Sequence, residues 1–224
     1  MRTGALAALA IGFVLTACTG CAGGASSTST PTTAAPIAPS ALDGLLLSAG
    51  DINSVMGGTT MTVTHSLTDM VDHANLLPNV NCLGIWEVSE KAIYADSGWT
   101  AIRGQVLRQP AAGDWDALTV QAVVSFPSAD AAHKFFAASA DRWSKCTRHT
   151  VNMTLNGQLT TYQFGDLART DTELTMHVTR GGDRSCQRAL SVTNNVVVDV
   201  AACSAAASDQ AATMVNKIRS RISH

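Results

Sequence analysis

Four cysteines lie in residues 41–224, at positions 82, 146, 186 and 203. An even number fits two disulfides in an exported protein, although four cysteines allow three different pairings. Proximity favours Cys186–Cys203, near the ends of two expected strands, and this leaves Cys82–Cys146. A zinc site is the alternative, but these four show no C-x-x-C or paired-histidine spacing. We therefore expect cross-links to restrict how this part of the chain folds.

Export is predicted from the start of the chain. An apolar run from Ala5 to Leu15 follows Arg2; it has the length of a signal-peptide core and is too short to span a bilayer. It ends in Leu15-Thr16-Ala17-Cys18, which resembles the lipobox of bacterial lipoproteins. We predict a signal peptide over 1–17 and a diacylated (palmitate-type) Cys18 that anchors the chain to the outer face of the cell membrane. Ordinary secretion with cleavage nearby is the alternative.

Residues 18–40 are expected to form a disordered tether. They are rich in Ser, Thr, Ala, Gly and Pro and carry no charge, so they bury too little surface to offset the entropy of ordering. A redox pair of Cys18 with Cys21 is disfavoured in such a segment, and the role of Cys21 stays open. Residues 41–224 are enough for one domain with a real core.

Charge is distributed unevenly along the predicted domain. Residues 41–141 carry 4 Lys/Arg and 11 Asp/Glu, a net charge of −7, whereas residues 142–224 carry 10 and 6, a net charge of +4. An acidic chain with scattered basic residues argues against nucleic acid as a partner. The two parts either face each other across a groove or are simply solvated surface.

The local pattern predicts an α+β domain. The order is a short helix, a strand and a helix, followed by mostly antiparallel strands with helices inserted, so we expect an antiparallel sheet with helices packed on one face. Asn156-Gly157 is the strongest hairpin signal. The expected helices are 48–56, 83–94, 129–145 and 209–222, and the expected strands are 59–66, 99–108, 117–126, 147–155, 158–164, 172–180, 185–193 and 195–203.

Polar side chains alternate along several of these strands. If the sheet has an open face, Arg103, Gln121 and His177 would give a cleft its polar specificity, and Trp99 would form an apolar side. The alternative is that these four residues belong to a solvated outer face. We predict them as ligand-binding residues.

Several blocks together resemble a known family. They are "LLLSAGDINSVMGG" (45–58), "NCLGIWEVSEKAIYADSGWTAIRGQVLR" (81–108), "VVSFPSADAAHKFFAASADRWSKC" (123–146) and "VVVDVAAC" before a final helix. These resemble the extracellular sensor domain of mycobacterial PknH-type receptor Ser/Thr kinases and the free-standing lipoproteins built on that domain. The resemblance implies an antiparallel sheet with packed helices around a deep cleft thought to bind a ligand. It also implies one long-range and one short-range disulfide, which Cys82–Cys146 and Cys186–Cys203 match. As a departure from those kinases, we expect neither a kinase domain nor a transmembrane helix, and a lipid anchor in place of the membrane span.

The chain shows no familiar catalytic signature. A nucleophile elbow, a zinc-protease helix, a P-loop and a dinucleotide glycine pattern are all missing. His65, Asp69, Asp72 and His73 have no fixed spacing for a metal. We expect no catalytic residues, metal or cofactor. The expected function is binding of a small molecule or envelope component; the alternatives are a protein-interaction module that serves a membrane or secreted partner and an envelope hydrolase.

Overall fold

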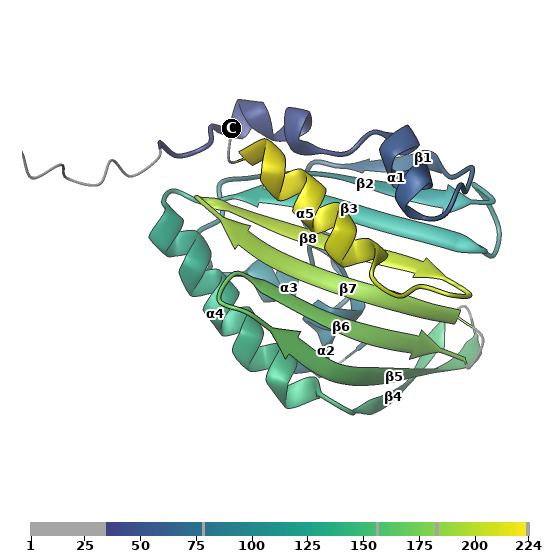
Figure 1. The fold of residues 1–224 in the computed structure, drawn as a ribbon. Helices are drawn as coiled ribbons and strands as arrows, with labels where there is room; N and C mark the ends of the chain where they lie inside the picture. The colour runs from purple at the N-terminus through teal and green to yellow at the C-terminus, as the bar shows by residue number, and fades with distance from the viewer. Residues whose placement is uncertain (1–34, 78, 156, 182–183, 223–224) are drawn as a thin grey trace, which may run out of the picture. The chain divides into compact units, whose positions relative to one another are not determined.

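One antiparallel sheet organises the described part of the chain, with strand order β1-β2-β3-β8-β7-β6-β5-β4 (Figure 1). A computed structural model describes residues 35–77, 79–155, 157–181 and 184–222. The predicted signal peptide, Cys18 and Cys21 lie outside these residues. The strands are β1 Thr62–Leu67, β2 Ala101–Gln109, β3 Ala117–Ser125, β4 Thr150–Leu155, β5 Gln158–Arg169, β6 Glu173–Arg180, β7 Arg184–Thr193 and β8 Val196–Ser204; the helices are η1 Pro39–Leu45, α1 Ala49–Val55, α2 Val80–Trp86, α3 Lys91–Tyr94, α4 Ala129–Cys146 and α5 Gln210–Ile222.

The α+β class, the antiparallel sheet and both disulfides are confirmed. Cys82 and Cys146 join α2 to α4, and Cys186 and Cys203 join paired positions on β7 and β8. The β4–β5 hairpin is also confirmed, with Leu155 opposite Gln158, although Asn156 of the predicted turn lies outside the described residues.

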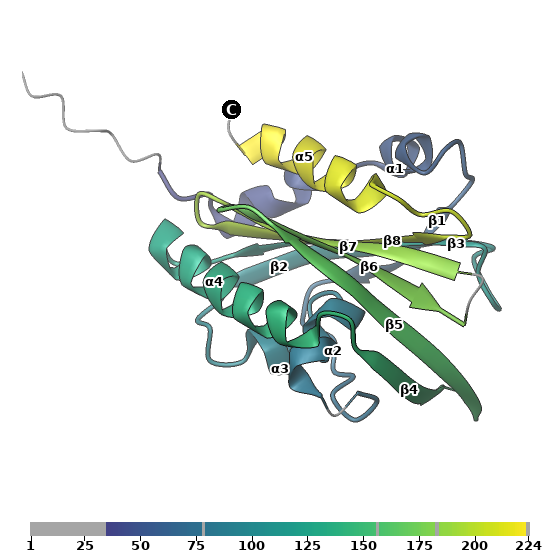
Figure 2. The ribbon, with the colours of Figure 1, turned by 60° about the horizontal axis from the view of Figure 1, so that its bottom comes forward.

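Helices cover both faces of the sheet, so the prediction of helices on one face is wrong. η1, α1 and α5 pack on one face, around residues such as Val198 and Val200, while α2, α3 and α4 pack on the other, around Val197 and Ala201. Figure 2 shows α5 and α4 on opposite sides of the strands. The physical reason is in β8: because its residues are buried on both faces, the strand needs a cover on each side.

Residues 83–94 form two short helices rather than the single helix that their apolar pattern predicts. α2 ends at Trp86, Ser89 takes a left-handed backbone with φ 58°, and α3 starts at Lys91. The backbone N–H of Ser89 donates to the buried carboxylate of Asp199 at 3.0 Å. A contact with a strand 110 residues away therefore interrupts the helix.

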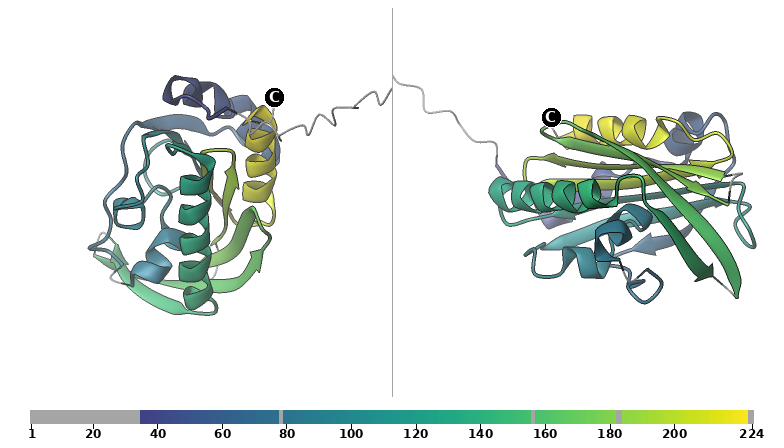
Figure 3. Two further views of the ribbon diagram at one scale, coloured as in Figure 1. Left: turned by 90° about the vertical axis from the view of Figure 1, so that its left-hand side faces the viewer. Right: turned by 90° about the horizontal axis from the view of Figure 1, so that it is seen from below.

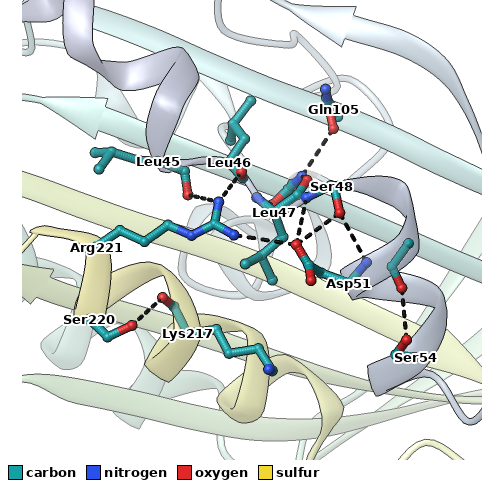
Figure 4. Close-up of polar contacts among 12 residues, drawn as sticks. Leu45, Leu46, Leu47, Ser48, Asp51, Ser54, Gln105, Lys217, Ser220 and Arg221 are labelled. Carbon is teal, nitrogen blue, oxygen red and sulfur yellow. Dashed lines mark hydrogen bonds and ion pairs between the residues drawn. The ribbon is translucent and has the colours of Figure 1, made fainter.

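The packed domain begins a few residues before the predicted boundary at 41. The backbone N–H of Ile37 donates to Asn195 Oδ1 at 2.7 Å, and the Asn195 side-chain amide donates to the Ile37 carbonyl at 3.1 Å. Further along, Ser48 caps α1 in a capping box with Asp51. Arg221 of α5 donates to the carbonyls of Leu45 and Leu46 and pairs with Asp51 at 3.3 Å (Figure 4). The last helix thus holds the start of the domain against the sheet.

Candidate functional site

A groove opens on the α2–α4 face of the sheet, beyond the part that the helices cover. Figure 3 shows α4 running beside the short helices of residues 80–94, which occupy this face. The floor of the groove comes from β3, β6 and β8, through Leu118, Val178 and Ala201. Its inner region has a volume of about 240 Å³. The lining residues are Ile85, Trp86, Glu87, Val88, Trp115, Leu118, Val120, Tyr162, Val178, Arg180, Cys186, Arg188, Ala201 and Cys203.

A second region of about 650 Å³ continues the groove toward the β1 edge of the sheet. Five residues line both regions, namely Glu87, Val88, Trp115, Leu118 and Val120. The outer region adds His65, Ser66 and Leu67 from β1, with Val106 and Arg108 from β2. The two regions are therefore one continuous hollow, of the size that small-molecule sites usually have.

Aromatic side chains from distant parts of the chain form one side of the groove. The Trp86 ring meets the Tyr162 ring edge-on, with centroids 6.2 Å apart, and it meets the His73 ring edge-on at 6.0 Å. Edge-to-face contacts of this kind are favoured by the ring quadrupoles. They fix the half-buried Trp86 indole where α2 ends, so that an apolar surface lines the groove.

The loop before α2 is held at the groove by His73. Its Nδ1 lies 2.9 Å from Glu87 Oε2, and its backbone N–H donates to Glu90 Oε2 at 3.0 Å. The hydrogen bond with Glu87 raises the pKa of His73, although partial burial opposes the shift. Burial raises the pKa of Glu90. His73 and Glu87 of this cluster line the groove, and Glu90 is bonded beside them.

Replacing His73 with Gln should make stability less sensitive to pH. Folding raises the His73 pKa above its ordinary value of 6.5. The stabilisation that His73 contributes is therefore full below that pH and is lost as pH rises through the folded pKa. The difference in unfolding free energy between wild type and His73→Gln should thus be larger near about pH 6 than near about pH 8.5. Urea unfolding at both values measures it. Glu87→Gln removes the main cause of the raised His73 pKa, so in that background the effect of His73→Gln should depend less on pH. A larger effect of His73→Gln at the higher pH would contradict a raised His73 pKa.

A buried ion pair lies beneath the groove. Arg188, only 1% exposed, donates to Asp199 Oδ1 at 2.7 Å and to the carbonyl of Ile85 at 2.7 Å. It also donates to the carbonyls of Gly84, Glu87 and Val200. Arg188 therefore satisfies the carbonyls where α2 ends and fixes Trp86 and Glu87 over the sheet.

The four predicted ligand-binding residues do not meet in one cleft. Trp99 packs against the core on the α4 face. On the opposite face, Arg103 pairs with Asp43 of η1 at 3.1 Å and Gln121 is fully buried. His177 is exposed on β6. The predicted alternation holds for Arg103, Gln121 and His177, but most of the face that these three share is covered by η1, α1 and α5. The prediction that Trp99 lies on the same face is wrong, because its side chain packs on the α4 face.

Gln121 has a structural role. Its amide accepts from the N–H of Leu47 at 3.0 Å and donates to the carbonyl of Leu47 at 2.9 Å, so it holds the segment between η1 and α1 on β3.

Gln121→Leu should destabilise the domain by about 2 kcal/mol, because it leaves two buried backbone groups without partners. Urea unfolding checks this, with exposed Gln158→Leu on β5 as the matched control. Equal midpoints for the two variants would show that Leu47 finds other partners.

The groove residues were largely missed by sequence reasoning. Trp86 has the helical spacing of a core residue, and Trp115 lies in the loop between β2 and β3. Two arginines that flank the β6–β7 turn, Arg180 and Arg184, place their guanidinium groups 5.4 Å and 4.9 Å from the centroid of the Trp115 ring. The local signal was a tryptophan between acidic residues in a hairpin loop, which gives no hint of its partners.

In the described ranges, no three His, Cys, Asp or Glu side chains gather as a possible metal site. No helix among the same residues is long and apolar enough to cross a membrane.

Comparisons with known proteins agree with this architecture. The family model described as the PknH-like extracellular domain matches residues 37–221. The chain is 36% identical over 184 residues to the serine/threonine-protein kinases PknH of Mycobacterium bovis and Mycobacterium tuberculosis, covering 81% of this chain but only 30% and 29% of those proteins. The crystal structure of the extracellular domain of PknH from Mycobacterium tuberculosis superimposes with a TM-score of 0.78 at 35% identity, covering 84% of this chain and 98% of that one.

Proposed function

This chain belongs to the family of PknH-like extracellular domains, and we propose that it is a cell-envelope lipoprotein whose domain binds a small molecule or envelope component without catalysing a reaction. The observation that carries the proposal is the groove. It is continuous, largely apolar and walled by Trp86, Trp115 and Tyr162, with a few charged groups among its lining residues. Sites of this composition are typical of small-molecule binding.

The chemistry of the groove supports binding rather than hydrolysis. In the described part of the chain, no serine or cysteine that lines the groove shares a hydrogen bond with a histidine, and the Nδ1 of His73 is engaged by Glu87. A nucleophile–base pair is the usual requirement of a hydrolase. The exposed large hydrophobic residues among those described are Val63, Val80 and Leu159, on β1, α2 and β5. Exposed hydrophobic residues that are scattered in this way do not form a protein-docking patch.

Native mass spectrometry of the protein purified from its own envelope tests the binding role. We expect a stoichiometric co-purifying molecule. Leu118→Trp should remove it, because Leu118 is partly exposed and lines both regions of the groove. Val63→Trp on β1 is the matched control, since Val63 is exposed, pairs with Leu107 of the opposite face and should leave binding unchanged. A wild-type protein without any bound molecule would count against the proposal.

Anchoring at Cys18 is the second part of the proposal. Two acyl chains hold a protein stably on a membrane, whereas one chain does so only marginally. The Cys18→Ala chain should therefore leave the membrane fraction. Its continued partition with membranes would overturn the lipid anchor and leave the groove unaffected.

A further inference from the structure

Two chemically different hollows meet at Arg180. On one side is the apolar groove, with Leu118, Val178 and Ala201 on its floor. On the other is a polar hollow of about 450 Å³ that opens between the β4–β5 hairpin, the β6–β7 turn and the loop between β2 and β3. The side chain of Arg180 lines both. The polar hollow is lined by Asp114, Leu159, Thr160, Thr161, Gln163, Thr179, Arg180, Gly181 and Arg184.

The Arg180 side chain is held near Trp115 and Asp114, yet its N–H groups remain available for hydrogen bonds. Its guanidinium lies near the Trp115 ring, and its Nη1 is 3.8 Å from Asp114 Oδ1, which is beyond hydrogen-bond length. In the part of the chain that the structure describes, the Arg180 side chain donates no hydrogen bond. Its side chain is 24% exposed, at the junction of the two hollows. A guanidinium held in this way loses little freedom when it binds a carboxylate or phosphate.

Positive charge gathers around the loop between β2 and β3. Arg180, Arg184 and Arg108 surround the loop that carries Asp114, so positive charge is in excess there among the described lining residues. The hydrogen bond from Arg184 lowers the pKa of Asp114 to about 2, and this carboxylate therefore offsets one of the three cations. Glu87 lines the part that the two regions of the groove share.

We propose that the ligand is an amphiphile, with its apolar chain against Leu118, Val178 and Ala201 and its anionic head group bound by Arg180. The inference rests on the proposed ligand-binding role of the groove. It sets the orientation of the ligand, because Arg180 stands where the apolar groove meets the polar hollow. The threonine hydroxyls and the Gln163 amide of the polar hollow provide further hydrogen bonds to the head group. A carboxylate head and a phosphate head share this chemistry, and the two sources are a fatty acid and a phospholipid.

Isothermal titration calorimetry on the full chain carrying Cys18→Ala tests the inference, since no covalent acyl chain then competes for the groove. The probes are dodecanoate, a dodecanoyl lysophosphatidylglycerol and the uncharged dodecyl maltoside. Both anionic probes should bind more tightly than the maltoside. Arg180→Gln should weaken the anionic probes at least tenfold and leave the maltoside unchanged, a loss typical of a charge-assisted contact. Exposed Arg148→Gln, which breaks a pair with Asp166 elsewhere, is the matched control.

The outcomes separate the two proposals. Tighter binding of dodecanoate than of the lysolipid identifies a fatty acid, and the reverse order identifies a phospholipid. Equal binding of all three probes, unaffected by Arg180→Gln but abolished by Leu118→Trp, overturns the anionic head group and keeps the binding role. If no probe binds, the amphiphile is excluded, and a co-purifying molecule in native mass spectrometry would still support the groove as a binding site.

Discussion

Arg188→Met should lower the free energy of unfolding by about 3–5 kcal/mol, because removing one partner of a buried ion pair leaves the other charge uncompensated. Asp199 is 3% exposed, and it also accepts from the Ser89 N–H and the Tyr94 hydroxyl. The substitution further leaves the carbonyls at the end of α2 without a donor. In a domain of this size the loss corresponds to roughly 10 °C in the melting temperature, which calorimetry or circular dichroism measures.

Two further variants test whether the unpaired charge of Asp199 causes the loss of stability. Arg188→Met combined with Asp199→Leu should recover much of the lost stability, since a buried pair replaced by apolar groups is often neutral. Arg148→Met removes an exposed arginine paired with Asp166 and should leave the melting temperature unchanged. If the double variant were less stable than Arg188→Met alone, the lost carbonyl partners rather than the unpaired charge would dominate.

Loss of the Cys82–Cys146 disulfide has the second large expected effect. On the loop-entropy model, closing 64 residues stabilises the fold by about 4 kcal/mol. The bond is also the covalent link between α2, which carries Trp86, and α4. Cys82→Ala with Cys146→Ala should therefore reduce stability by about this amount in urea. Hydrogen exchange should become faster in α2, which forms one side of the groove.

The second disulfide provides the comparison. Cys186 and Cys203 close only 17 residues, on strands that are already paired from Ser185–Ser204 to Thr193–Val196. Cys186→Ala with Cys203→Ala should cost about 3 kcal/mol on the same model and leave exchange in α2 unchanged. A greater loss of stability here than for the Cys82–Cys146 pair would contradict the expectation that the disulfide closing the longer loop stabilises more.

Most individual elements could be predicted from the sequence. The expected strand 117–126 corresponds to β3 at Ala117–Ser125, and the expected helix 129–145 corresponds to α4 at Ala129–Cys146. The hydrophobic periods of 2 for strands and 3.6 for helices are local properties of the sequence. They predict the elements correctly because each element buries the face that its pattern defines. The helix expected over 83–94 failed because Ser89 and Glu87 bind Asp199 and Arg188, whose positions no local pattern reveals.

The candidate site depended much more on tertiary structure. Sequence alternation correctly placed Arg103 and Gln121 on one face, but the sequence did not show that this face is covered near both residues. The uninterrupted apolar run of β8 was the available signal for helices on both faces. Arg180, Trp86 and Tyr162 come from three separate elements and Trp115 from a loop, so these residues come together only when the sheet order is set.

The sequence by itself determined most of the elements and, through the family resemblance, the two disulfides, because each follows from short-range periodicity or from a pattern shared over the domain. Beyond the β4–β5 hairpin, tertiary structure decided the order of the strands across the sheet and which face each helix covers. It also decided where Arg188 and Asp199 interrupt a helix. These outcomes depend on contacts between residues about 100 positions apart, whose energies compete with local preference and override it where a buried charge must be satisfied.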